Sequence, residues 1–195
     1  MRDRLLALCV LALVVGLATA ASALTTLDFE GLPTTYYYFY GNQNIGGYYP
    51  GVTFGPDATI FDRVIGGYND SDYPPHSGNA VFATYNELNY VDITFDTPVS
   101  YVEGWFTFYG TGYLEAYNAD GSLVGSDSMP DNYPGGNDMM SVSASSIKWV
   151  RIHDDGGGWT GDDIAYEPVP EPSSLLALLS GIGGLGTLAG LRRRA

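Results

Sequence analysis

The chain is 195 residues long and strongly acidic, with 22 acidic residues against 8 basic ones and a net charge of −14 at pH 7. A surface of this charge repels nucleic acid and anionic lipid, so both are excluded as partners of the folded part. Cys9 is the only cysteine, which excludes an intramolecular disulfide.

A secretory signal peptide is predicted over residues 1–23. Two arginines within the first four residues precede an uncharged apolar stretch over 5–17, and the small residues Ala21 and Ala23 follow it. A basic start, an apolar segment and a small-residue cleavage site are typical of exported proteins. We therefore expect cleavage after Ala23 or, alternatively, after Ala20, and a mature chain outside the cytoplasm.

The central segment, residues 24–167, has the length of one domain. It contains three basic and twenty acidic residues, which gives it a net charge of −17. This acidity either keeps an exported domain soluble or attracts divalent cations. The chain is rich in tyrosine and glycine, and the central segment shows no sustained helical period. It is therefore predicted to be all-β.

Short apolar or alternating runs separated by turn residues predict the strands. Residues 90–96 alternate most regularly, with Val91, Ile93 and Phe95 expected inward. Thr97-Pro98 is read as a turn and Gly104 as a possible bulge, while Asp120-Gly121 predicts a hairpin. The predicted strands are 26–30, 52–54, 58–61, 80–85, 90–96, 99–109, 112–118, 123–128, 147–153 and 162–166.

Four segments between these strands are predicted to be loops. Residues 34–50 are crowded with tyrosine, and residues 66–79 and 129–138 combine aspartate, tyrosine and proline. The fourth, 154–161, is a glycine-rich turn around Trp159. Strands spaced by such turns favour a two-sheet sandwich with jelly-roll or Greek-key connections, flanked by a signal helix and a C-terminal transmembrane helix.

Four short motifs of the central segment resemble those of extracellular galactose-binding-like jelly-roll domains. They are Asp28-Phe29-Glu30, His76-Ser77-Gly78-Asn79, Asp92-Ile93-Thr94-Phe95 and Asp162-Asp163-Ile164. The resemblance spans most of residues 26–167 and implies the same sandwich fold.

The C-terminal segment, residues 168–195, has three parts. Pro170, Glu171 and Pro172 form a proline-clamped turn, an uncharged apolar run covers 175–191, and Arg192, Arg193 and Arg194 follow at once. As a helix the run would be roughly 26 Å long, slightly short of a hydrocarbon core of about 30 Å. Because positive charge resists translocation, the arginines are expected to stay cytoplasmic and the central domain to lie outside.

These three parts, in this order, resemble the PEP-CTERM sorting signal of Gram-negative bacteria, which is also known as an ice-binding-protein C-terminal domain. The resemblance implies that an exosortase at the inner membrane cuts near Pro-Glu-Pro and passes the protein to the cell surface or extracellular matrix. The alternative is that the apolar run remains as a permanent anchor. Nothing about ice follows, because the central segment lacks a regular Thr-x-Thr array.

A structural calcium ion is the one cofactor that the sequence suggests. The first and last strands of jelly rolls commonly run side by side, which would bring Asp28 or Glu30 near Asp162 or Asp163. Carboxylates suit calcium, and the resemblance to galactose-binding-like domains implies such an ion in some of them. The alternative is a solvated acidic edge, since no EF-hand spacing is present.

A carbohydrate-binding surface is the second candidate site. Trp149, Arg151 and His153 are predicted to share one face of their strand, and Trp159 follows in the adjacent loop. Aromatic faces with neighbouring polar groups are what sugar sites use. The alternative is that these aromatics pack between the sheets.

No catalytic motif is present. His76 and His153 are the only histidines, and there is neither a Gly-x-Ser-x-Gly sequence nor a pair of zinc-spaced histidines. The sequence therefore predicts a non-enzymatic surface or matrix protein with a structural, adhesive or polymer-binding domain, its partners being exosortase, the inner membrane and extracellular polysaccharide. The alternatives are a lectin with a defined sugar ligand and a glycoside hydrolase that uses paired carboxylates.

Overall fold

The computed structural model describes residues 23–32, 45–64, 70–84 and 89–169. Within them, Leu24–Val169 form one compact unit. The predicted signal peptide, apart from Ala23, and the predicted sorting signal from residue 170 onward fall outside the described residues, so the predictions for Ala21 and for the segment 170–195 stay predictions. Ala23 is the first described residue and is exposed. In these described ranges, no helix is long and apolar enough to cross a membrane.

The described part of the chain is all-β, as the sequence predicts, and every strand pairing is antiparallel. Nine strands form one hydrogen-bonded network in the order β3-β4-β9-β5-β8-β6-β7, with β1 on β9 and β2 on β5. Their bounds are β1 Thr25–Leu27, β2 Val52–Phe54, β3 Ala58–Asp62, β4 Ala80–Thr84, β5 Tyr90–Phe108, β6 Gly112–Tyr117, β7 Leu123–Met129, β8 Asp138–Asp154 and β9 Trp159–Pro168.

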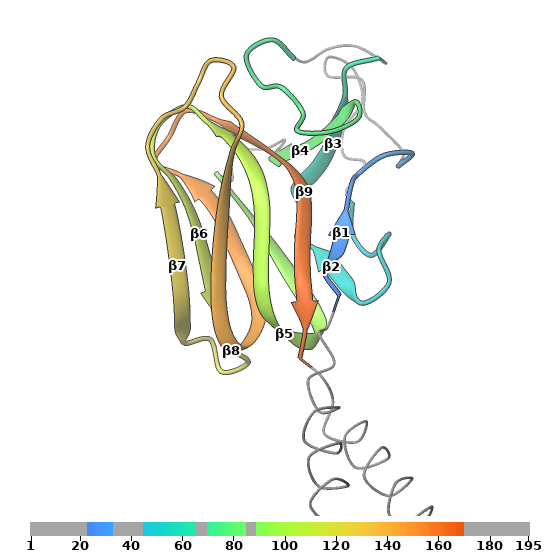
Figure 1. The fold of residues 1–195 in the computed structure, drawn as a ribbon, viewed down its shortest axis with the longest axis vertical. Coiled ribbons are helices and arrows are strands. Elements are labelled where there is room, and N and C mark those ends of the chain that lie inside the picture. The colour runs from blue at the N-terminus through green and yellow to red at the C-terminus, as the bar shows by residue number, and fades with distance from the viewer. Residues whose placement is uncertain (1–22, 33–44, 65–69, 85–88, 170–195) are drawn as a thin grey trace, which may run out of the picture. The chain divides into compact units, whose positions relative to one another are not determined.

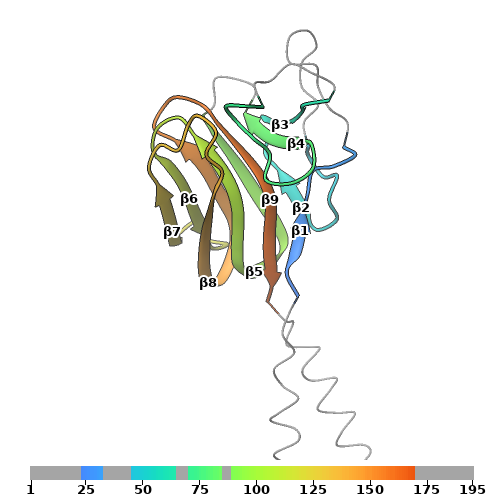
Figure 2. The same cartoon turned by 45° about the horizontal axis from the view of Figure 1, so that its top comes forward.

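The network folds over into two layers because β5 and β8 are long enough to run through both (Figure 1). Register shifts between Thr94 and Val99 of β5 mark the bend. Before the bend, β5 pairs with β2 and with the end of β8, which in turn pairs with β6. After it, β5 lies between β9 and the start of β8. Figure 2 shows β6 and β7 on one layer and β9 on the other. The result is the predicted two-layer sandwich.

The core lies between the layers and is built largely from phenylalanine. Phe54 of β2 meets Phe82 of β4 edge-on, with ring centroids 5.8 Å apart, and Phe29 packs on Phe82 at 4.8 Å. Phe82 also meets Trp159 at 5.5 Å. All four side chains are buried. Each such ring removes a large apolar area from water, so this cluster fixes how the layers face each other.

The first and last strands lie side by side. Thr25 pairs with Tyr166 and Leu27 with Ile164, so β1 runs antiparallel to the end of β9. The chain therefore enters and leaves the sandwich at the same end, as the jelly-roll expectation required.

Several local predictions are confirmed. Val91, Ile93 and Phe95 are buried, as the alternation predicts. A register shift between Glu103 and Trp105 interrupts the β5–β9 ladder at Gly104, as expected of a bulge. The Asp-Gly turn connects β6 to β7.

Three strand boundaries predicted from the sequence were wrong. Thr97-Pro98 does not end a strand, because β5 continues through it. Pro98 lies where the ladder is already shifted, so its missing N–H interrupts no regular pairing. The strand predicted over 147–153 begins at Asp138, where Met140 and Val142 are buried in alternation. Finally, Trp159 starts β9 instead of belonging to a turn.

Candidate functional site

The outward side of β8 carries the row of side chains that the sequence singles out. Trp149, Arg151 and His153 are partly exposed, whereas Val150 and Ile152 between them are fully buried. This is the period-two alternation of a strand with one face in the core. The three side chains therefore share one face, as predicted.

Neighbouring strands extend this row into a nine-residue surface, here named the β5–β8–β6 face. In the observed register Trp149 lies between Thr94 and Tyr117, Arg151 between Asp92 and Glu115, and His153 between Tyr90 and Tyr113. Cross-strand neighbours on one face are about 5 Å apart and interact directly. The sequence missed the six added residues because their proximity depends on strand pairing.

Two stacked ring pairs flank the centre of this face. Tyr117 stacks on Trp149 with ring centroids 3.9 Å apart and planes 5° from parallel. Tyr113 stacks on His153 at 4.8 Å and 16°. Because stacked partners come from adjacent strands, the rings stand upright on the sheet. Thr94 is the cross-strand neighbour of Trp149 on the side opposite Tyr117.

The centre of the face is charged. Arg151 donates from Nε to Asp92 Oδ1 at 2.7 Å and from Nη2 to Asp92 Oδ2 at 2.8 Å. Its guanidinium lies 4.0 Å from the ring centroid of Tyr90. These contacts hold the guanidinium group in a fixed plane.

Glu115 occupies the other side of Arg151. Tyr117 donates its hydroxyl to Glu115 Oε2 at 2.6 Å, and this bond raises the pKa of the tyrosine. His153 Nε2 lies 3.6 Å from the same oxygen, beyond normal hydrogen-bond distance. Glu115 therefore keeps acceptor capacity for a further donor.

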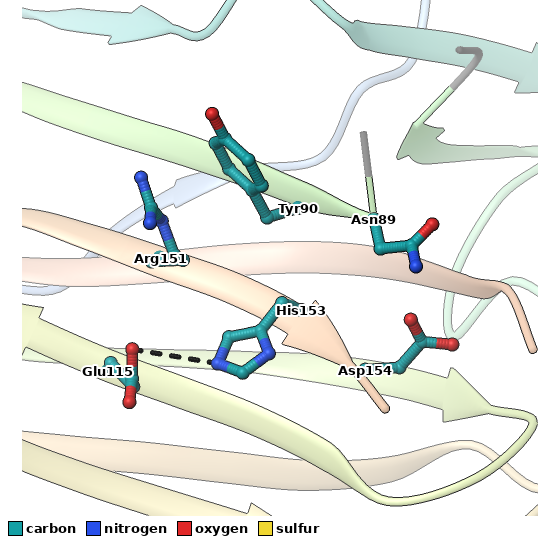
Figure 3. A pocket seen from close by; sticks show the side chains of 6 residues that line it. All are labelled: Asn89, Tyr90, Glu115, Arg151, His153 and Asp154. Carbon is teal, nitrogen blue, oxygen red and sulfur yellow. Dashed lines mark ion pairs between the residues drawn. The ribbon is translucent and has the colours of Figure 1, made fainter. Parts of the chain in front are cut away.

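A pocket of about 340 Å³ opens at one end of this face (Figure 3). This volume is at the lower end of the range for small-molecule sites, roughly 300–1,000 Å³. The side chains that line it are Asn89, Tyr90, Glu115, Arg151, His153 and Asp154.

Asp154 contributes an unusual group to this pocket. The residue is 7% exposed, and its Oδ2 accepts the N–H groups of Gly157 at 2.9 Å and Gly158 at 2.7 Å. Its Oδ1 is buried and accepts no hydrogen bond within the described part of the chain. A buried carboxyl oxygen without a donor is costly, so this atom marks a position where a ligand donor would be stabilising.

The structure does not bring Trp159 to the β5–β8–β6 face. The side chain is only 3% exposed and packs on Phe82 and Phe108 in the core. Its Nε1 donates to the carbonyl oxygen of Asn89 at 3.4 Å. The prediction of Trp159 as a ligand-binding residue is corrected: as the first residue of β9 it faces inward.

The acidic residues proposed for calcium gather around one loop, residues 76–80. Glu30 Oε1 accepts the N–H groups of Asn79 and Ala80 at 2.7 and 2.8 Å. Asp162 Oδ2 accepts the N–H of Ser77 at 2.9 Å. Asp162 is fully buried, and burial raises the pKa of its carboxyl to about 6.

The neighbouring Asp163 is bound to the same loop. One of its oxygens lies 2.7 Å from His76 Nδ1, and the other accepts the Ser77 hydroxyl at 3.1 Å. The Ser77 hydroxyl thus donates to Asp163 and not to His76, so these two neighbours do not form a Ser–His pair of the kind that activates a nucleophile. The His76 ring instead stacks on Trp105 at 3.8 Å on the second layer.

These contacts bear on the calcium prediction. Three of the four predicted carboxylates serve as acceptors for the 76–80 loop, and Asp28 Oδ1 accepts the N–H of Glu30 at 3.3 Å. Among the residues that the structure describes, no three His, Cys, Asp or Glu side chains are arranged to hold a metal. The arrangement does not by itself supply a calcium site, and calcium binding stays a prediction.

No protein-family model matches this chain, and no curated protein matches it. Among solved structures, the K2 cleaved adhesin domain of Lys-gingipain is 14% identical, with a TM-score of 0.48 over 74% of this chain and 99% of that one.

Two further solved structures are carbohydrate-binding modules. CsCBM6-3 from Clostridium stercorarium, in complex with cellobiose, is 15% identical, with a TM-score of 0.39 over 70% of this chain and 98% of that one. A family 29 module from Piromyces equi is 8% identical, with a TM-score of 0.42 over 77% and 93%. Because all three TM-scores lie below 0.5, the functions of those proteins are not carried over to this chain.

Proposed function

We propose that this chain is an exported β-sandwich protein that binds a carbohydrate polymer through the β5–β8–β6 face. The observation that carries the proposal is the arrangement of two stacked aromatic pairs around a fixed guanidinium–carboxylate pair. Sugar sites combine aromatic rings, which contact the C–H faces of the sugar, with rigid polar groups that bind its hydroxyls. Both are present here on one sheet.

The surroundings of Trp149 support this reading. One face of the indole is covered by Tyr117, and Arg151 lies 5.5 Å from the indole centroid. Its cross-strand neighbour on β5 is Thr94, which has a short side chain. A sugar ring placed beside the indole would contact it and reach the guanidinium group, and the row of side chains along β8 would let a polymer contact further residues.

A pair of matched tryptophan variants tests the proposal. The purified full-length chain is screened on a glycan array and then titrated with the best ligand. Trp149→Ala is expected to weaken binding at least about tenfold, or about 1.4 kcal/mol. Trp105→Ala is the control, because Trp105 stacks on His76 on the other layer. Equal losses in both variants, or no bound glycan at all, would contradict the proposal.

We also propose that residues 168–195 act as a sorting signal for an exosortase. The support is the order of Pro170-Glu171-Pro172, the apolar run and the arginines in the sequence. Processing would release the domain to the cell surface or matrix, where a polymer-binding face is useful. Intact mass spectrometry of the surface-exposed protein tests this, because a mass that includes Arg194 would show that the tail is retained.

A further inference from the structure

The charge balance of the pocket limits the sugars that it can accept. Arg151 is the one basic side chain that lines it, apart from the imidazole of His153, and Asp92 neutralises it through two hydrogen bonds. Glu115 and Asp154 remain, and neither is bonded to a lysine or arginine in the described part of the chain. The pocket is therefore acidic inside an acidic domain.

Asp154 Oδ1 is the acceptor in this pocket that a ligand could satisfy. It is a buried acceptor without a donor, while Oδ2 is occupied by two backbone N–H groups. In Figure 3 the Asp154 carboxyl group faces the side chain of Asn89 at the rim of the pocket. Asn89 is exposed, so its side chain can move aside without losing core packing. A donor that takes its place would lie beside the Asp154 carboxyl group.

Resting on the proposed function, we infer that this pocket selects amine-bearing sugars, such as glucosamine units of a polymer. A protonated amine supplies three N–H donors and a positive charge, which suits two carboxyl groups that have no lysine or arginine partner. An N-acetylated sugar offers one neutral N–H instead. A uronic acid would place a third carboxylate beside Glu115 and Asp154 and be repelled.

Three oligosaccharides of equal length test this selectivity on the full-length chain. They are a glucosamine hexamer, its fully N-acetylated form and a galacturonate hexamer, titrated at a salt concentration of about 0.15 M, where long-range attraction is screened. We expect the glucosamine hexamer to bind at least about tenfold more tightly than the acetylated one. The galacturonate hexamer should bind most weakly.

Charge variants decide whether the pocket or the overall charge is responsible. Asp154→Asn and Glu115→Gln should each reduce the amine preference to less than about threefold. Asp96→Asn removes the same charge from an exposed site outside the pocket and should leave the preference intact. If Asp154→Asn unfolds the 154–158 turn, shown by a lowered melting temperature, Glu115→Gln alone decides.

The possible failures are distinguishable. If all three oligomers bind equally in a Trp149-dependent manner, the amine selectivity is wrong while the carbohydrate-binding proposal stands. The selectivity is also wrong if Asp96→Asn lowers the preference as much as the pocket variants do. If none of the three oligomers binds and no other glycan does, both proposals fail.

Discussion

Arg151 and Asp92 form a bidentate ion pair that joins β8 to β5 at the centre of the β5–β8–β6 face, with both N–O distances below 3 Å. Each side chain is about one-third exposed. Exposed pairs contribute little to stability because water screens them. The pair therefore matters more for the fixed orientation of the guanidinium group than for holding the sandwich together.

A double-mutant cycle on this pair should give a small coupling energy. Arg151→Ala, Asp92→Ala and the double variant are unfolded with urea. We expect a coupling of about 0.5–1 kcal/mol, the upper part of the range for partly exposed pairs. Arg151→Ala alone should cost more than Asp92→Ala, because it also removes the contact with Tyr90. A coupling above about 3 kcal/mol would show that the pair behaves as a buried one.

Gly78 should be intolerant of any side chain. Its φ is +57°, and a Cβ at this position would collide with Glu30 Oε1, the oxygen that accepts two loop N–H groups. Gly78→Ala is therefore expected to cost about 2 kcal/mol or more, measured by urea unfolding. Gly121→Ala is the matched control, since its φ of +83° is also unfavourable but its surroundings are open. It should cost about 1 kcal/mol. Equal costs would mean that Glu30 moves away freely.

Asp162 should lower the free energy of unfolding as the pH rises, whereas most carboxylates have the opposite effect. Its pKa rises from 3.8 to about 6 on folding, chiefly because burial disfavours the charged form. The folded state thus binds the proton more tightly than the unfolded state. The resulting contribution of Asp162 to the free energy of unfolding is fully present below about pH 4 and is lost as the pH rises through about 6. A shift of about two pKa units corresponds to about 3 kcal/mol at most.

The measurement is the difference in unfolding free energy between the parent chain and Asp162→Asn across this pH window. The parent should lose stability relative to the variant as the pH rises, whatever the absolute cost of the substitution. Asp96→Asn, an exposed site, should follow the parent curve. Parallel curves for Asp162→Asn would show that this carboxyl group is not the source.

Calcium binding predicts a stabilisation that is absent when chelator is present. If the ion is held by Glu30 and Asp163, millimolar calcium should raise the melting temperature of the purified chain above its value in EDTA. Glu30→Gln should abolish the difference. Identical melting temperatures in calcium and EDTA would rule out the structural ion and leave hydrogen bonding to the 76–80 loop as the role of these carboxylates.

Local periodicity predicted the parts of the fold that depend on one segment. The alternation around Ile93 and the outward row of Trp149, Arg151 and His153 follow from the two-residue repeat of a strand, which needs no knowledge of neighbours. The proline signal was less reliable. Pro98 looked like the end of a strand, yet a register shift lets β5 continue past it.

The rest of the site depends on which strands pair, and this is not visible in one segment. Tyr113 and Glu115 belong to β6, and only the β6–β8 register places them beside His153 and Arg151. Asp154 looked like a turn residue, but the N–H groups of Gly157 and Gly158 bind one oxygen and leave the other unpartnered. Trp159 was misplaced because its burial comes from contacts with Phe82 and Phe108.

The position of β5 between β8 and β9 has a mechanical consequence. Suppose that a polymer is bound by side chains of β8 and that the domain is attached through the chain after β9. A force on the polymer would then be transmitted through both ladders of β5. The strands run along the sandwich, so such a pull slides them past one another and loads many hydrogen bonds together. A central strand with partners on both edges is thus suited to bear a force applied between β8 and the end of β9.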